Sequence, residues 1–185
     1  MRARDLFGIP NLVTFLRVVL VPVILWLLTL DDPRARWWAL GVFVFAAWTD
    51  SIDGWVARRF DGVTAWGQFA DPVADKLLVI GVLASLALVD ELPWWAVVVI
   101  VGREVAVTVL RVRLVQRQGR VMPASVWGKV KTVSQIIAIA AHLLPGAPPV
   151  IAQRLLDVAV VLTVWSGIEY GFRARRLAHA GQDAG

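Results

Sequence analysis

Residues 12–30, LVTFLRVVLVPVILWLLTL, are apolar at almost every position, and Arg17 is their one charged residue. An α-helix rises about 1.5 Å per residue, so a stretch of this length crosses the hydrocarbon core of a bilayer, which is about 30 Å thick. No cleavage-site pattern follows the stretch, and it is longer than the apolar core of a signal peptide. We therefore expect a retained transmembrane helix here.

The rest of the chain shares this apolar character. Of its 185 residues 58% are hydrophobic, and the mean hydropathy of +0.68 is too high for a soluble domain of this size. Barrel strands would be shorter and would alternate between apolar and polar residues. The sequence predicts an all-α, polytopic membrane protein with a single membrane domain over residues 1–185. Its six expected transmembrane helices cover residues 12–30, 35–59, 71–89, 93–117, 125–144 and 149–175.

The distribution of Arg and Lys predicts the orientation of these helices, because cytoplasmic loops retain positive charge. The formal net charge is +5, and the outer side has an acidic turn at 90–93 and an uncharged Pro-rich turn at 145–149. Tryptophan pairs at 37–38 and 94–95 fall at the expected outer boundary, where they would anchor the helices. We expect both termini and a polar cavity to face the cytoplasm. Basic residues at helix ends, instead of in one stripe, favour anionic lipids and phosphorylated substrates over nucleic acid.

Four aspartates lie toward the expected cytoplasmic ends of the second and third helices: Asp50, Asp53, Asp71 and Asp75. An aspartate at the centre of a membrane helix costs about 2.5 to 3.5 kcal/mol, so their presence needs an explanation. The spacings i, i+3 and i, i+4 place each pair on one helical face. Across a helical hairpin the two pairs could hold one or two divalent cations, and their hard oxygen ligands suit Mg²⁺ or Mn²⁺. The chain has no cysteine for a thiolate site.

The alternative is that these carboxylates are interfacial residues paired with Arg58, Arg59 and Lys76. The spacing of the whole segment argues against it. The segment reads Asp50-x2-Asp53-Gly54-x2-Ala57-Arg58-x8-Gly67-x3-Asp71-x3-Asp75. It resembles the signature of the CDP-alcohol phosphatidyltransferase family at all eight defined positions, and a chance match is about one in ten to the tenth per starting position. The resemblance implies that the four aspartates form a metal cluster and that Asp75 is also the general base.

The resemblance further implies that CDP-diacylglycerol is the phosphatidyl donor and places its nucleotide on the aspartate hairpin. Small residues on the aspartate face would allow a base or a diphosphate to approach the backbone, although close helix packing is the alternative. Polar residues at the start of the first helix could donate to the diphosphate, or could cap and anchor that helix instead. The expected donor-binding residues are Asn11, Thr14, Arg17, Asp53, Gly54, Ala57, Arg58 and Gly67.

An acceptor that carries its own phosphate needs cations near the metal site, and the candidates are Arg103, Arg111, Lys129 and Lys131. Each could instead serve only to retain its loop in the cytoplasm. Lys129 and Lys131 are about 200° apart on an ideal helix, so they cannot share one face unless the helix start is irregular. The segments around these cations read Arg103-Glu104-x6-Arg111 and Gly128-Lys129-x-Lys131-Thr132. Together with residues 71–76 they resemble the branch of the family whose acceptor is glycerol 3-phosphate.

The expected reaction is thus transfer of a phosphatidyl group to glycerol 3-phosphate with release of CMP, and resemblance adds a homodimer in the bacterial cytoplasmic membrane. Sister branches of the family, cardiolipin synthase and phosphatidylinositol phosphate synthase, share several of the outer motifs and stay open as alternatives. A divalent-cation transporter would also need buried carboxylates. It would continue its polar path across the membrane, whereas the outer halves of these helices are almost wholly apolar.

Overall fold

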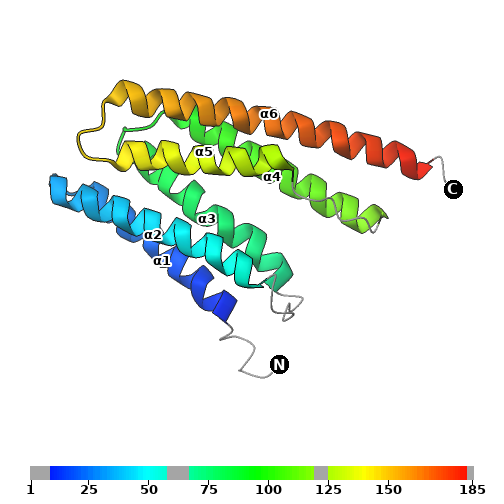
Figure 1. The fold of residues 1–185 in the computed structure, drawn as a ribbon, viewed down its shortest axis with the longest axis horizontal. Coiled ribbons are helices and arrows are strands. Elements are labelled where there is room, and N and C mark those ends of the chain that lie inside the picture. Colours follow the sequence, from blue (N-terminus) through cyan, green and yellow to red (C-terminus); the bar gives the residue numbers. More distant parts are fainter. Residues whose placement is uncertain (1–8, 58–66, 119–124, 183–185) are drawn as a thin grey trace.

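The computed structural model describes residues 9–57, 67–118 and 125–182, and the side chains within 19–49, 76–114 and 125–176. Over these residues the chain forms six α-helices and no strand (Figure 1). The helices are α1 (Ile9–Leu28), α2 (Pro33–Ala57), α3 (Gly67–Leu88), α4 (Trp94–Gln118), α5 (Val126–Leu143) and α6 (Pro149–Gln182). The all-α class and the order of six helices predicted from the sequence are confirmed.

The helix boundaries lie within four residues of the predicted ones, apart from the C-terminal end of α6. That helix continues to Gln182, seven residues beyond the predicted end at 175. The prediction ended the helix where the apolar run ends. The following residues, 176–182 (RLAHAGQ), no longer form an apolar run, but most of them have good helix propensity, so the helix does not need to stop there.

Three short turns, at 29–32, 89–93 and 144–148, gather at one end of the molecule (Figure 1). Asp32 caps the start of α2, since its carboxylate accepts a hydrogen bond of 2.8 Å from the backbone N–H of Arg34. Asp90 and Gly146 both adopt left-handed backbone conformations, with φ of 58° and 77°. Asp and Gly are among the residues that tolerate this region best, which explains why the chain can reverse so sharply there.

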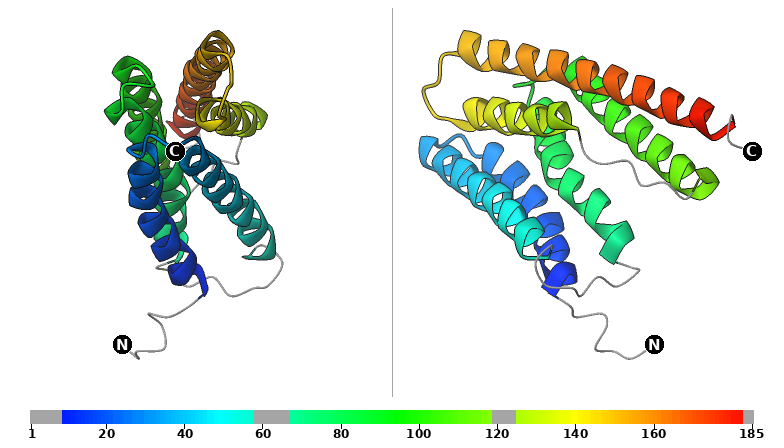
Figure 2. Two further views of the ribbon diagram at one scale, coloured as in Figure 1. Left: turned by 90° about the vertical axis from the view of Figure 1, so that its left-hand side faces the viewer. Right: turned by 45° about the vertical axis from the view of Figure 1, so that its right-hand side comes forward.

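The helices pack in two groups that share a core. α1 packs against α2 and α3, while α6 packs against α4 and α5, and α3 also contacts α4 and α5. Among the helix pairs that are in contact over the described residues, α2 and α3 touch each other least, and their ribbons diverge toward the end away from the three turns (Figure 2). The ends that carry the predicted aspartates are therefore the ends at which these two helices separate.

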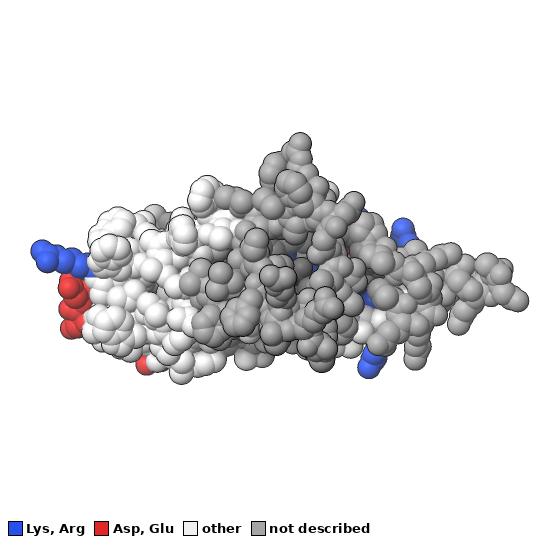
Figure 3. Space-filling model, turned by 90° about the horizontal axis from the view of Figure 1, so that it is seen from below, with Lys and Arg blue, Asp and Glu red and all other residues white. Residues whose placement is uncertain are grey.

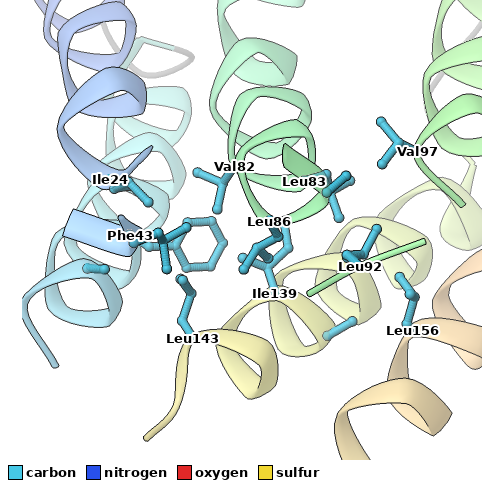
Figure 4. Close-up of a cluster of buried hydrophobic side chains, with 14 of the residues drawn as sticks. Ile24, Phe43, Val82, Leu83, Leu86, Leu92, Val97, Ile139, Leu143 and Leu156 are labelled. Carbon is cyan, nitrogen blue, oxygen red and sulfur yellow. The ribbon is translucent and has the colours of Figure 1, made fainter. Parts of the chain in front are cut away.

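The core lies between the two groups of helices, and all of the residues labelled in Figure 4 belong to it: Ile24, Phe43, Val82, Leu83, Leu86, Leu92, Val97, Ile139, Leu143 and Leu156. Phe43 of α2 and Leu86 of α3 are fully buried, although their helices touch little elsewhere. In a bilayer such contacts stabilise the fold through close van der Waals packing, because lipid tails are as apolar as these side chains.

Gly81 allows α1 and α3 to approach closely. A Cβ atom at this position would lie 2.6 Å from Cγ1 of Val21, a separation that real side chains do not adopt. Small residues at such contacts are common between membrane helices, because they let two backbones come together. The glycine thus fixes the distance between the first and third helices.

The outer faces of the helices expose many large apolar side chains, among them Val98, Trp165 and Phe172, each more than half exposed. The tryptophans of the pairs at 37–38 and 94–95 are also at least half exposed, close to the end with the three turns. In Figure 3, acidic and basic side chains gather at the left-hand tip of the molecule. Most of the surface beside this tip that is not grey is white, and so is uncharged. Where side chains are described, one helix, Pro149–Arg176, is long and apolar enough to span a membrane, with a mean hydropathy of 1.5.

Candidate active site

The four predicted aspartates lie at the end of the molecule opposite the three turns. Asp50 and Asp53 belong to the last turns of α2, and Asp71 and Asp75 to the first turns of α3. Both segments are regular α-helix, so the two spacings do place each pair on one helical face. The structure describes the backbone of these four aspartates but not their side chains, so the convergence of the four carboxylates on a metal stays a prediction.

Seven of the eight predicted donor-binding residues lie at the same end. Asn11, Thr14 and Arg17 are in the first turns of α1, Gly54 and Ala57 in the last turn of α2, and Gly67 begins α3. Arg58 lies outside the described residues, as do the side chains of the others. Among the side chains described, no three His, Asp or Glu residues gather as metal ligands, and the four aspartates are not among those side chains.

Lys76, the residue that follows Asp75, belongs to a buried ionic cluster around Glu104 of α4. Its carboxylate contacts three cations: Lys76 of α3, at 3.2 Å from Nζ to Oε2, Arg103, at 3.0 Å from Nη1 to Oε1, and Lys131 of α5. Glu104 and Lys131 are each 5% exposed. A buried charge is tolerated only when it is paired and hydrogen-bonded, and each of these charges is.

Lys76 connects α3 to α4 by more than this ion pair. Its Nζ also donates to Oγ1 of Thr108 at 2.6 Å and, more weakly, to the backbone carbonyl of Glu104 at 3.5 Å. The Thr108 hydroxyl in turn donates to that same carbonyl at 2.7 Å. Lys76 is therefore held by a network of hydrogen bonds and an ion pair on the neighbouring helix, α4.

Arg103 is nearly buried between α4 and α6. A Cβ atom at Gly167 of α6 would lie 3.0 Å from its Cγ, so the absence of a side chain at 167 leaves the space that Arg103 occupies. Its Nε is buried and has no hydrogen-bond partner among the residues that the structure describes. A donor of a charged group left in this way is rare in folded proteins and marks a place where a ligand or water can bind.

Arg111 lies two turns further along α4 and pairs with α6 instead of with Glu104. Its Nε donates to the hydroxyl of Tyr170 at 3.2 Å, and its guanidinium lies 5.8 Å from the centre of that ring. Tyr170 is buried, whereas Arg111 remains exposed. Arg111 lies in the C-terminal half of α4, away from the three turns, so its exposed side chain is at the end of the molecule that carries the aspartates.

Lys129 and Lys131 lie on opposite faces of α5, as their spacing predicts. Ser125 caps this helix regularly, since its Oγ accepts from the N–H of Gly128 at 3.0 Å. The regular start leaves Lys129 exposed while Lys131 is buried against Glu104. Of the four predicted acceptor cations, the structure thus brings Arg103 and Lys131 together, and it leaves Arg111 and Lys129 apart from them.

Sequence reasoning assigned no role to Glu104 or to a polar line that continues the cluster between α5 and α6. There Gln135 donates to the hydroxyl of Thr163 at 2.8 Å, and both are buried together with Ser166. A signal for this line was present. Lys131 and Gln135 are spaced i, i+4, and Thr163, Ser166 and Tyr170 follow one face of α6 at i, i+3, i+7.

A separate cavity lies away from these residues. It has a volume of about 760 Å³ and lies at the end with the three turns, where Arg36, Glu91, His142 and Asp157 line it. Its charges pair with each other: Arg36 with Glu91, and Asp157 with Gln153 and, at 3.9 Å, with Arg154. This cavity is distant from the predicted aspartates, which lie at the opposite end of the molecule.

Comparison with known proteins agrees with the sequence pattern. The family model for CDP-alcohol phosphatidyltransferase matches residues 7–165. A probable phosphatidylglycerophosphate synthase of Mycobacterium tuberculosis is 41% identical, over 95% of this chain and 85% of its own length. The CDP-diacylglycerol–glycerol-3-phosphate 3-phosphatidyltransferase of Bacillus subtilis is 40% identical, over 89% of this chain and 94% of its own. The enzyme of the same name from Escherichia coli is 36% identical, over 91% and 96%.

The matched region covers the aspartate segment, the Glu104 cluster and the first half of α6. The relatives align over most of their own length as well, so the likeness extends to the whole fold. This chain belongs to the CDP-alcohol phosphatidyltransferase family.

Proposed function

We propose that this chain transfers the phosphatidyl group of CDP-diacylglycerol to sn-glycerol 3-phosphate, giving phosphatidylglycerophosphate and CMP. The observation that carries the proposal is the complete aspartate segment, at residues 50–75, in a chain that is 36% to 41% identical to relatives named for this reaction. The ionic cluster around Glu104 supports it. A phosphorylated acceptor requires cations next to the helix that carries Asp71 and Asp75, and this cluster supplies them.

The metal site would be formed by Asp50, Asp53, Asp71 and Asp75. Four carboxylates on two helices fit Mg²⁺ or Mn²⁺, which prefer oxygen ligands, and two ions could share them. Divalent ions, when bound, neutralise the diphosphate of the donor and polarise the phosphorus that is attacked. Gly54 and Ala57 leave room for the nucleotide beside these carboxylates. Arg58 and the polar residues of α1, Asn11, Thr14 and Arg17, would hold the diphosphate oxygens.

Asp75 would act as the general base. Its carboxylate accepts the proton of the acceptor hydroxyl as that oxygen attacks the β-phosphorus of CDP-diacylglycerol. A new phosphoester bond forms, the bond between the β-phosphorus and the bridging oxygen breaks, and CMP leaves with the electron pair. The phosphate of the acceptor would meanwhile be held by Arg103 and Lys131, with Arg111 nearer the solvent. Lys129 is exposed on the other face of α5, so it is less suitable than Lys131 for binding this phosphate.

We further propose that all six helices span the bacterial cytoplasmic membrane, with both termini in the cytoplasm. The exposed apolar side chains on the outer helix faces and the exposed tryptophans near the three turns support this arrangement. It puts the aspartates and the Glu104 cluster toward the cytoplasm, where acceptors of this chemical class are dissolved. Homodimerisation is kept as a prediction from the resemblance.

A parallel assay tests the proposed reaction. Purified protein with CDP-diacylglycerol and Mg²⁺ is offered glycerol 3-phosphate, inositol phosphate, serine and phosphatidylglycerol, and CMP release is measured for each. Glycerol 3-phosphate should be the best acceptor, with phosphatidylglycerophosphate as the lipid product. Preference for phosphatidylglycerol or inositol phosphate would assign the chain to a sister branch, and absence of CMP release with every acceptor would refute transfer altogether.

A further inference from the structure

A single carboxylate holds together cations that come from three different helices. Glu104 contacts Lys76 of α3, Arg103 of its own helix α4, and Lys131 of α5. If that carboxylate were absent, three like charges would face one another in a largely buried space. Like charges in such surroundings repel strongly, so the cations could not all keep their present positions.

The cluster nevertheless carries more positive than negative charge. Three cations against one carboxylate leave a formal charge of +2, and Nε of Arg103 lacks an acceptor among the described residues. A phosphate monoester carries about −1.5 to −2 charges at pH 7 and presents three strong acceptor oxygens. An anion of this class would balance the excess charge and could supply the missing acceptor.

The cluster is also in the right place for the acceptor of the proposed reaction. Lys76 directly follows Asp75, so their Cα atoms are about 3.8 Å apart, although their side chains leave the helix about 100° apart. A molecule with a hydroxyl at Asp75 and a phosphate a few bonds away would therefore bring that phosphate to these cations.

We propose that Glu104 is a positioning residue for the acceptor phosphate. Its carboxylate uses one donor of Lys131 and one of Arg103, and thereby orients both side chains so that their remaining donors converge on the phosphate. A lysine has three donors and an arginine five, so each can serve the carboxylate and a ligand together. This inference rests on the proposed function, since it names the residue that organises the acceptor side of that site.

Replacement of Glu104 by Gln distinguishes positioning from simple charge attraction, because the two predict opposite signs. Glu104→Gln raises the formal charge of the cluster from +2 to +3. If net charge alone attracted the acceptor, the KM for glycerol 3-phosphate would fall. If Glu104 positions the cations, that KM should rise by about ten- to hundredfold, the scale of one lost charge-assisted hydrogen bond.

The donor substrate provides the internal control. The KM for CDP-diacylglycerol should stay within about twofold of the parent value, because a positioning residue on the acceptor side does not touch the nucleotide. Glu104→Asp keeps the charge and shortens the side chain by one methylene, so its KM for glycerol 3-phosphate should lie between those of the parent and Glu104→Gln. A merely structural carboxylate would instead affect both substrates equally.

A second pair of variants tests the same inference without a change of charge. Gly167→Ala places a Cβ atom 3.0 Å from Cγ of Arg103 and forces that side chain to shift. It should raise the KM for glycerol 3-phosphate several-fold. Gly171→Ala lies one turn further along α6, where nothing is within 4 Å of the added atom, and should leave both KM values unchanged.

The outcomes separate this inference from the function on which it rests. A parent enzyme that does not use glycerol 3-phosphate refutes the proposed function and the inference together. An active parent with a lower or unchanged KM in Glu104→Gln, or with equal losses for both substrates, refutes the positioning role alone. If Glu104→Gln cannot be purified as folded protein, the glycine pair decides: an unchanged acceptor KM in Gly167→Ala overturns the inference, and a selective rise upholds it.

Discussion

Lys129 and Lys131 are two residues apart on α5, yet Lys131 is buried against Glu104 and Lys129 is exposed on the opposite face. Replacement of each by Met keeps the apolar stem and removes the charge. Lys131→Met should raise the KM for glycerol 3-phosphate by about ten- to hundredfold, while Lys129→Met should change it by less than about threefold. Steady-state kinetics with saturating CDP-diacylglycerol measures both. Equal effects of the two variants would mean that the cations act through the field of the whole surface.

Asp75 is predicted to be the general base. Asp75→Asn removes the proton acceptor but keeps the shape and one oxygen ligand, so turnover should fall by about 10² or more. Binding of CDP-diacylglycerol should survive better, although some metal affinity is expected to be lost. The measurement compares the loss of turnover with the loss of metal affinity. Equal losses would mean that Asp75 acts only as a metal ligand and not as the general base.

Chelation tests the metal prediction directly. An excess of chelator should abolish CMP release, because four carboxylates without cations would repel one another and the donor diphosphate. Added Mg²⁺ or Mn²⁺ should restore it. Full activity in the chelated sample would contradict a metal-dependent reaction.

Gly81 should be among the positions that are most sensitive to a small increase in volume. Gly81→Ala brings a Cβ atom within 2.6 Å of Val21 Cγ1, and overpacking of this kind typically costs about 1–3 kcal/mol of unfolding free energy. Gly41→Ala is the control, because nothing lies within 4 Å of its added atom and alanine favours the helix. Thermal unfolding in detergent compares them. A melting temperature that is lowered equally by both would contradict close packing of α1 on α3.

Topology can be tested with fusion reporters. Reporters placed after Arg120 and at the C-terminus should report the cytoplasm, and one within residues 145–149 should report the outside, because basic residues are retained on the cytoplasmic side. The reverse pattern would place the aspartates on the side away from the cytoplasmic acceptor and would contradict the proposed orientation.

Sequence periodicity could predict the helices well because apolar runs and turn-forming residues mark both of their ends. The breaks at 31–33, 90–93 and 145–149 all coincide with observed turns, and Asp90 and Gly146 supply the backbone conformations that reversal needs. The end of α6 was missed because helix propensity, and not hydropathy, extends it.

The ionic cluster could be predicted only in part. The cations Arg103 and Lys131 stand out in an apolar sequence, but Glu104 and Lys131 are 27 residues apart and Lys76 and Glu104 are 28 apart. Their pairing depends on how three helices rotate against one another, which a pattern within one helix does not specify. The face of each lysine on α5, by contrast, follows from helical geometry alone, and that prediction is confirmed.

The three tight turns join the helices at one end, where Arg36 in the first turn of α2 pairs with Glu91 of the turn at 89–93, and the predicted catalytic and binding residues lie toward the other end. The contacts that hold the helices together at the turns are therefore far from the residues that are expected to select the substrate. Residues around the acceptor could be exchanged in the course of evolution without loosening the turns. One scaffold can in this way serve several alcohols, and a change of acceptor would require no change of fold.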